Sequence, residues 1–158
     1  MVDNKKIYQF LFKNEDKRTS IMKEMEEYLN TAIKGVESSW KLNGKIAKNT
    51  QKYIEHAEEN FMQEILQLNS ELRKLSEMET DTYKKDVKSL LKLESENSQT
   101  TLNIFINKLN CFDMINSGES EDKIAKKQQE ITLLIEVLSS LREQINDFIS
   151  NLKYKYLF

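Results

Sequence analysis

Apolar side chains recur every seven residues along two stretches of the chain. The first ladder comprises Ile33, Trp40, Ala47, Ile54, Phe61, Leu68 and Leu75, and the second comprises Ile124, Ile131, Leu138, Ile145 and Leu152. Such a repeat gives a helix a seam along which it pairs with another helix. The chain contains no proline, the strongest helix breaker, so its helices can be long. The pattern predicts an all-α fold of long amphipathic helices, arranged as an extended coiled coil or an antiparallel helical bundle.

The first ladder changes character at Phe61. From there Ile65 and Leu72 add a second apolar column, whereas the same column earlier in the chain holds Glu37, Gly44, Gln51 and Glu58. Polar residues at seam positions lower stability but fix register and oligomeric state. The earlier part of the ladder is therefore predicted to set register or to face a partner.

Breaks in the pattern divide one predicted structural unit into segments. Residues 1–14 are expected to form an N-terminal arm, followed by one long, continuous or bent helical region over residues 15–115. The first ladder keeps its phase across Gly44, which favours a continuous or gently bent helix there, with a hairpin as the alternative. The polar run over residues 94–101 predicts either a solvated stretch of helix or a bend.

The clearest break surrounds Gly118. Glycine there suits the left-handed conformation that ends many helices, and Ser120 suits the start of the next helix. We predict a turn over residues 116–122 and a C-terminal coiled-coil helix over residues 123–158. Further apolar residues beside its seam widen the apolar face, which favours a bundle of three or more helices.

The two ladders and their second columns supply the candidate helix–helix interface. The residues predicted to form it are Ile33, Trp40, Ile54, Phe61, Ile65, Leu68, Leu72, Leu75, Ile131, Leu134, Leu138, Leu141, Ile145, Phe148 and Leu152. If that face meets a partner, the tryptophan is a strong anchor.

Both ends of the chain carry aromatic residues. Tyr156, Leu157 and Phe158 are predicted to make a terminal contact, because such side chains pack against something more often than they are solvated. The apolar stretch Ile7–Phe12 is too short for the core of a signal peptide. No stretch approaches the roughly 20 apolar residues of a membrane span, so none is predicted.

Charge and cysteine content narrow the class of protein. The formal net charge is −2 and the basic and acidic residues are interspersed, which is typical of solvated helix faces. Small basic pairs such as Lys84–Lys85 leave local nucleic-acid contacts open, but the charge does not indicate them. Cys111 is the single cysteine, which excludes an intrachain disulfide. We expect it to be a small buried hydrophobe in an intracellular, reducing compartment.

No residue pattern typical of catalysis or cofactor binding is found. His56 is the single histidine, whereas a di-metal bundle needs a Glu-x-x-His motif from each of two helices. Adjacent acids such as Glu26 and Glu27 point to different sides of a helix, and no glycine-rich phosphate loop is present. We predict that the protein is not an enzyme and has no catalytic, metal or cofactor-binding residues.

Several segments resemble one known family. The stretch Glu26–Lys34 followed by Trp40, the stretch Phe61–Met62 through Leu72–Lys74, and the break at Gly118 about forty residues before Leu157–Phe158 carry the likeness. Over residues 25–158 the chain resembles the coiled-coil proteins of the meiotic chromosome axis, the lateral-element family of the synaptonemal complex. The resemblance implies a rod-shaped tetrameric or hetero-oligomeric nuclear assembly that polymerises through its ends.

The first functional expectation is a non-catalytic helical scaffold that pairs through coiled-coil seams, with the chromosome axis as its specific form. Its partners would be itself, as a homo-oligomer, another helical protein, or both. The alternative is a four-helix adaptor or chaperone of a bacterial secretion system, with breaks near residues 43–44, 77–82 and 116–122. A second alternative is a membrane-surface helical protein that uses Ile7–Phe12. The expected location is intracellular: nuclear if the family resemblance holds, and cytoplasmic otherwise.

Overall fold

The computed structural model describes residues 4–43, 47–78 and 81–157, and these residues are helical apart from one turn. The elements are α1 (Asn4–Asn43), α2 (Ala47–His56), the π-helix η1 (Ala57–Met62), α3 (Gln63–Met78), α4 (Asp81–Asn116) and α5 (Glu121–Leu157). Because α2, η1 and α3 follow one another without a gap, they form one long helical segment. The described residues contain no strand, so the predicted all-α fold is confirmed.

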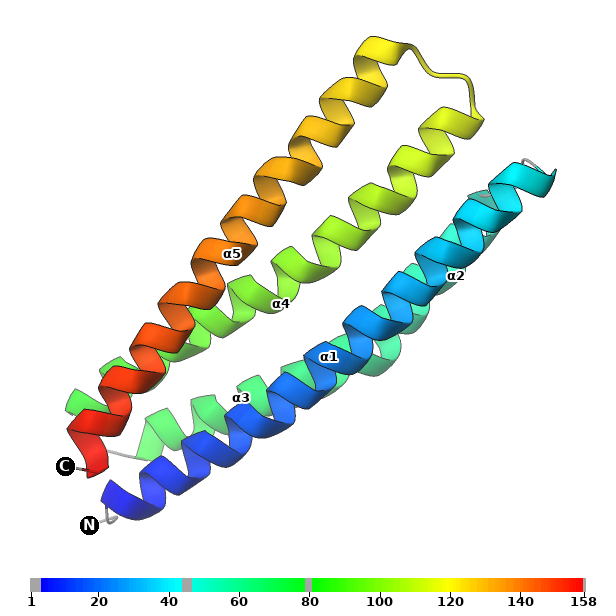
Figure 1. Ribbon diagram of the computed structural model, residues 1–158. Coiled ribbons are helices and arrows are strands. Elements are labelled where there is room, and N and C mark those ends of the chain that lie inside the picture. Colours follow the sequence, from blue (N-terminus) through cyan, green and yellow to red (C-terminus); the bar gives the residue numbers. More distant parts are fainter. Residues whose placement is uncertain (1–3, 44–46, 79–80, 158) are drawn as a thin grey trace.

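The helices fold back on one another as an antiparallel bundle (Figure 1). Within the described residues, α4 contacts α5, α3 and α1, and α1 also contacts α3 and α5. The N- and C-termini therefore lie at the same end of the bundle, which we call the terminal end. The α4–α5 turn lies at the opposite end, which we call the hairpin end.

The chain reverses direction after α1. The ring of Tyr28 lies 5.7 Å from the ring of Phe61, and Arg18 reaches Asn69 further along the returning segment. The favoured interpretation of residues 15–115 as one long helical region is therefore wrong, and the hairpin alternative is what the structure shows. The ladder keeps its phase because both arms of the hairpin turn it toward one core: Ile33 and Ile54 pack around the same buried pair, Val36 and Leu109.

The residues expected to form an N-terminal arm are part of a helix in the structure. From Asn4 onward its residues form the first turns of α1. Ile7 and Leu11 are buried in a cluster with Leu72, Leu90 and other side chains of the terminal end. Because these apolar residues are part of the core, α1 begins well before the acidic residues that suggested a helix start.

The turn between α4 and α5 follows the predicted chemistry. Gly118 adopts a left-handed φ of 72°, and the backbone N–H of Glu119 donates to the carbonyl of Met114 at 3.0 Å. This geometry satisfies carbonyl groups that the end of α4 would otherwise leave unpaired. The Ser120 hydroxyl accepts a hydrogen bond from the backbone N–H of Lys123 at 3.4 Å, so it caps α5. The predicted break and helix start are confirmed.

The compact bundle makes a prediction about molecular shape. The longest helix, α1, contains 40 residues, which corresponds to about 60 Å of helix. Small-angle X-ray scattering with light scattering is therefore expected to show a monomer whose maximum dimension is about 70 Å. An extended rod longer than about 100 Å would contradict the folded-back arrangement, because it requires helices joined end to end.

A candidate site between α1, α4 and α5

The predicted interface residues lie mostly in contacts between helices of the same chain. The buried ones are Ile65, Leu68, Leu72, Ile131, Leu141, Ile145 and Leu152. The partly buried ones are Ile33, Ile54, Phe61, Leu75, Leu134, Leu138 and Phe148. The side chain of Trp40 lies outside the part of the chain that the structure describes.

The predicted terminal contact is visible at one of its three residues. The hydroxyl of Tyr156 donates to the Oδ2 atom of Asp86 at 2.6 Å, and Lys155 forms an ion pair with the same oxygen. Tyr156 also packs against the core cluster of the terminal end. Phe158 and the side chain of Leu157 lie outside the described residues. The C-terminus of α5 is thus held to α4 of its own chain.

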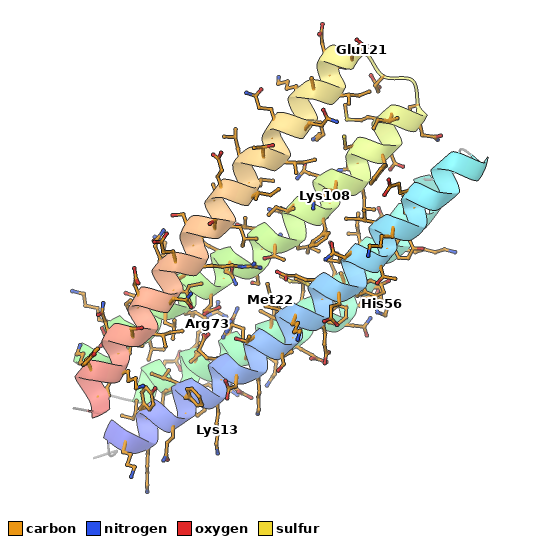
Figure 2. The ribbon with its side chains drawn as sticks, viewed as in Figure 1. Lys13, Met22, His56, Arg73, Lys108 and Glu121 are labelled. Carbon is orange, nitrogen blue, oxygen red and sulfur yellow. The ribbon has the colours of Figure 1, made fainter. Side chains whose placement is uncertain are left out.

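Polar side chains interrupt the core at one level along the bundle. This polar layer comprises Asn14, Glu15 and Arg18 of α1, Asn69 of α3, and Glu94 and Asn97 of α4. It separates the cluster at the terminal end from the next cluster, which includes Met25 and Leu29. Figure 2 shows Met22, which borders the layer, lying between α1 and α4.

Arg18 is the centre of this layer and is only 2% exposed. Its Nη1 atom donates to Oδ1 of Asn69 at 2.6 Å, and its Nη2 atom donates to Oδ1 of Asn14 at 2.8 Å. Asn14 in turn donates to the backbone carbonyl of Leu68 at 3.1 Å. A buried guanidinium needs such partners because removing an ion from water costs several kcal/mol.

Two carboxyl groups face the remaining side of the guanidinium. The Nε atom of Arg18 lies 3.5 Å from Oε2 of Glu94 and 3.6 Å from Oε1 of Glu15. Burial raises the pKa of Glu94 from its ordinary 4.5 to about 9, the neighbouring Glu15 adds to the rise, and Arg18 opposes it. At neutral pH the Glu94 carboxyl therefore holds a proton, and the cluster contains one cation and one anion.

The polar run over residues 94–101 has one buried side and one exposed side, and α4 continues through it as a helix. Glu94, Asn97, Ser98 and Thr101 are buried. Two of its hydroxyls bond to the backbone of their own helix: Thr101 to the carbonyl of Asn97 at 2.8 Å, and Ser98 to that of Ser95 at 3.2 Å. Such local bonds satisfy buried hydroxyl groups without interrupting the helix. The expectation of a solvated stretch or a bend is corrected accordingly.

A cavity of about 380 Å³ adjoins the polar layer between α1, α4 and α5. We call it the polar cavity. Glu15, Arg18, Glu94 and Asn97 line its buried side, together with the apolar Met22 and Ile145, while Thr19, Lys23, Arg142 and Asn146 line its exposed side. An ion pair between Arg142 of α5 and Glu26 of α1 joins the two helices beside the opening.

Several buried polar atoms in the wall of this cavity have no hydrogen-bond partner. They are Oε1 of Glu15, Oε1 of Glu94, Oδ1 of Asn97 and Nε of Arg18. An unsatisfied buried polar group costs about 1–3 kcal/mol. The ion pairs of Arg18 Nε with Glu15 and Glu94 offset part of this cost.

A second cavity, of about 300 Å³, lies nearer the hairpin end between the same three helices. We call it the apolar cavity. Its apolar wall is formed by Ile33 of α1, Cys111, Phe112 and Ile115 of α4, and Ile131 of α5. Toward this end the α4–α5 hairpin diverges from α1 (Figure 1). The seam between α1 and α5 is thus looser here than at the terminal end.

Three apolar side chains of α5 remain exposed toward the hairpin end. Leu133 is 55% exposed and Val137 is 49% exposed, and their four-residue spacing places them on one flank of the helix. Ile135, 46% exposed, lies on the other flank, one turn from Ile131, which lines the apolar cavity. Of the three, Ile135 is therefore the residue beside the cavity.

The two other residues considered as candidates for chemistry, Cys111 and His56, pack within or against the helices of the bundle. Cys111 is buried, as predicted, and burial raises the pKa of its thiol while Lys127 opposes the rise. His56 is exposed, with its ring 4.4 Å from that of Tyr28.

Among the residues that the structure describes, no group of three or more His, Cys, Asp or Glu side chains could hold a metal ion. None of the described helices is long and apolar enough to cross a membrane.

Sequence reasoning missed the polar layer, although its residues occupy core positions. Asn14 and Arg18 continue the three-and-four spacing of Leu11 and Met22 along α1. On α4, Glu94 and Asn97 continue that of Leu90. A polar residue in a seam position on several segments at once is the signal that could have revealed the layer.

Comparisons with known proteins leave the function to be argued from geometry. The chain matches no protein-family model, no curated protein and no solved structure.

The pKa of Glu94 predicts a pH dependence of stability. Because the folded state holds this proton up to about pH 9 and the unfolded chain releases it near its ordinary pKa, unfolding releases a proton between these values. The free energy of unfolding is therefore expected to fall as pH rises from 5 to 9, by up to about 1 kcal/mol per pH unit. Urea denaturation at several pH values measures this slope.

The matched variants are Glu94→Gln and Glu96→Gln, two residues apart on α4. Glutamine at position 94 cannot ionise, so its slope between pH 5 and 9 should be clearly shallower than that of the natural protein. Glu96 is exposed, and its replacement should leave the slope unchanged. Equal slopes in all three proteins would show that Glu94 does not hold a buried proton.

Proposed function

We propose that this protein is a non-catalytic four-helix adaptor that binds an amphipathic helix of another protein at the hairpin end of the α1–α5 seam. The observation that carries the proposal is the apolar cavity together with the apolar residue exposed beside it on α5. Ile135 is 46% exposed and lies one turn from Ile131, which lines the cavity. We call Ile135 and the apolar cavity the α5 surface.

The shape of the α5 surface favours a helix as its occupant. Where α1 and α5 diverge, they leave a groove whose floor is formed by Phe112 and Ile115 of α4. A third helix can lay its apolar face between two such helices, with side chains spaced three and four residues apart entering the groove. Exposed apolar patches bordered by charged residues are typical of protein–protein contacts.

The adaptor role is better supported than a self-assembling scaffold. Coiled-coil assembly needs seams that are free to pair, whereas Leu72, Ile145 and Leu152 are buried within one chain. Pairing between copies through these residues would require the bundle to open. The chromosome-axis scaffold, which was the first expectation, requires that additional step, and the adaptor does not.

The membrane-surface alternative has less support. Of the stretch Ile7–Phe12 that motivated it, Ile7 and Leu11 are buried in the core cluster of the terminal end, and Phe12 is 52% exposed. An interfacial helix needs a continuous apolar face directed toward the lipid. The buried face of α1 is already used within the bundle.

Site-specific photo-crosslinking in the native cell tests the adaptor proposal. A photoreactive phenylalanine analogue placed at position 128 or 135 is expected to yield one discrete adduct with another protein, because Gln128 lines the apolar cavity and Ile135 lies on the same side of α5. Lys153 is the matched control position: it is exposed and lies on the same side of α5 as Ile135, about five turns nearer the terminal end.

The adaptor proposal requires that crosslinking depends on position along α5. An adduct at positions 128 and 135 but not at 153 supports it. Crosslinks only to a second copy of this chain would favour the scaffold instead. Equal crosslinking at all three positions, or none at any, would show that the α5 surface is not a specific docking site.

A further inference from the structure

Charges that are interspersed along the sequence are separated in space by the fold. The outermost described residues of the terminal end belong to four helices and cover 4–9, 73–78, 81–86 and 152–157 (Figure 1). The basic residues among them are Lys5, Lys6, Arg73, Lys74, Lys84, Lys85, Lys153 and Lys155, and the acidic ones are Glu77, Asp81 and Asp86. Asp3 and Glu79 adjoin these stretches in the sequence, and basic residues still predominate when both are included. The terminal end is therefore basic, although the whole chain carries a formal net charge of −2.

Four of these lysines surround the terminal end, one on each helix of the bundle. We call them the lysine ring: Lys6 of α1, Lys74 of α3, Lys85 of α4 and Lys153 of α5. Each is exposed and lies about 6 Å or less along the helix axis from the end of its helix. None of the four forms an ion pair with another described residue, whereas Lys155 pairs with Asp86.

The distribution of the lysine ring around the bundle axis favours a flat anionic surface as its partner. A rod-shaped polyanion that lies along one side of the bundle can contact the lysines of only one or two helices. A surface perpendicular to the bundle axis meets all four lysines at once. An anionic lipid bilayer is such a surface, and clusters of about four to eight Lys or Arg residues are typical of protein segments that bind it.

An exposed aromatic side chain lies at the same level of the bundle. Tyr154 is 71% exposed and follows Lys153 in the last turn of α5. Tyrosine is enriched at the interface between membrane and water, because its ring is apolar and its hydroxyl is polar. Lysine side chains suit the same interface, since their methylene groups contact apolar surface while the charge remains in water.

We propose that the terminal end binds end-on to a lipid bilayer that contains anionic phospholipids. The lysine ring contacts the headgroup phosphates, and Tyr154 lies among the headgroups. The bundle stays folded, so this mode differs from an interfacial helix formed by Ile7–Phe12. The site is independent of the α5 surface, because Ile135 lies about 33 Å from the C-terminal end of α5 and remains accessible to a protein partner.

Flotation of the full chain with lipid vesicles tests the proposal. Vesicles of phosphatidylcholine alone are compared with vesicles that also contain about 30% phosphatidylserine, an anionic lipid. We expect binding to the anionic vesicles only. This binding should be lost when the salt concentration is raised from about 50 mM to about 500 mM, because salt screens exposed charges.

Two matched variants show whether the position of the charges matters. One carries Lys6→Gln, Lys74→Gln, Lys85→Gln and Lys153→Gln. The control carries Lys34→Gln, Lys52→Gln, Lys123→Gln and Lys126→Gln, which alter exposed residues away from the terminal end and change the net charge equally. Each lysine near an anionic surface strengthens binding about fivefold, so loss of the lysine ring should weaken vesicle binding at least about a hundredfold. The control should bind nearly as the natural protein does.

Three results would overturn the proposal. The first is the absence of binding to the anionic vesicles, and the second is equal weakening of binding in the two variants. The third comes from titration of the protein into fluorescent duplex DNA at the lower salt concentration. Binding to the duplex without binding to the anionic vesicles would identify a nucleic acid, and not a bilayer, as the partner of the terminal end.

Discussion

The Arg18 guanidinium is a charge that lies fully inside the core of this bundle, and the alignment of three helices depends on it. Its terminal nitrogens bond to Asn14 of α1 and Asn69 of α3, and its Nε atom faces Glu94 of α4. An apolar seam tolerates sliding by whole heptads because one buried leucine resembles the next. A buried guanidinium does not, because a shift would leave a charge without partners at a cost of several kcal/mol.

The same arrangement explains why the α1–α5 side is the candidate for binding. The hydrogen-bond partners of Arg18 belong to α1 and α3. The two carboxyl groups that face it belong to α1 and α4. By contrast, α5 is joined to this region by the surface ion pair of its Arg142 with Glu26 of α1. The polar cavity lies between them. Nearer the hairpin end, the apolar cavity lies between α1, α4 and α5, and Ile135 is exposed beside it. The proposed docking site therefore lies along the helix that the polar layer constrains least.

Local features could be predicted from the sequence, whereas pairings between distant residues could not. Heptad spacing and the absence of proline are local, and they correctly predicted an all-α protein; Gly118 and Ser120 correctly predicted the α4–α5 turn. The reversal after α1 was missed because antiparallel arms that share a core can keep one apolar phase. Arg18 was missed because its partners Asn69 and Glu94 are far away in sequence. Periodicity alone cannot distinguish a partnered polar residue in a seam from a solvated one.

A double-mutant cycle between Arg18 and Asn69 tests most directly whether this interaction holds the bundle together. Chemical denaturation of Arg18→Met, Asn69→Leu and the double variant gives the free energies of unfolding. We expect Arg18→Met to destabilise by about 3 kcal/mol, since it leaves the buried amide oxygens of Asn14 and Asn69 without their donor and Glu15 without its ion-pair partner, and Asn69→Leu by about 1–3 kcal/mol. The double variant should lose at least about 1 kcal/mol less than the sum of the two. Strictly additive losses would contradict the account, because they would show that the two side chains do not depend on each other.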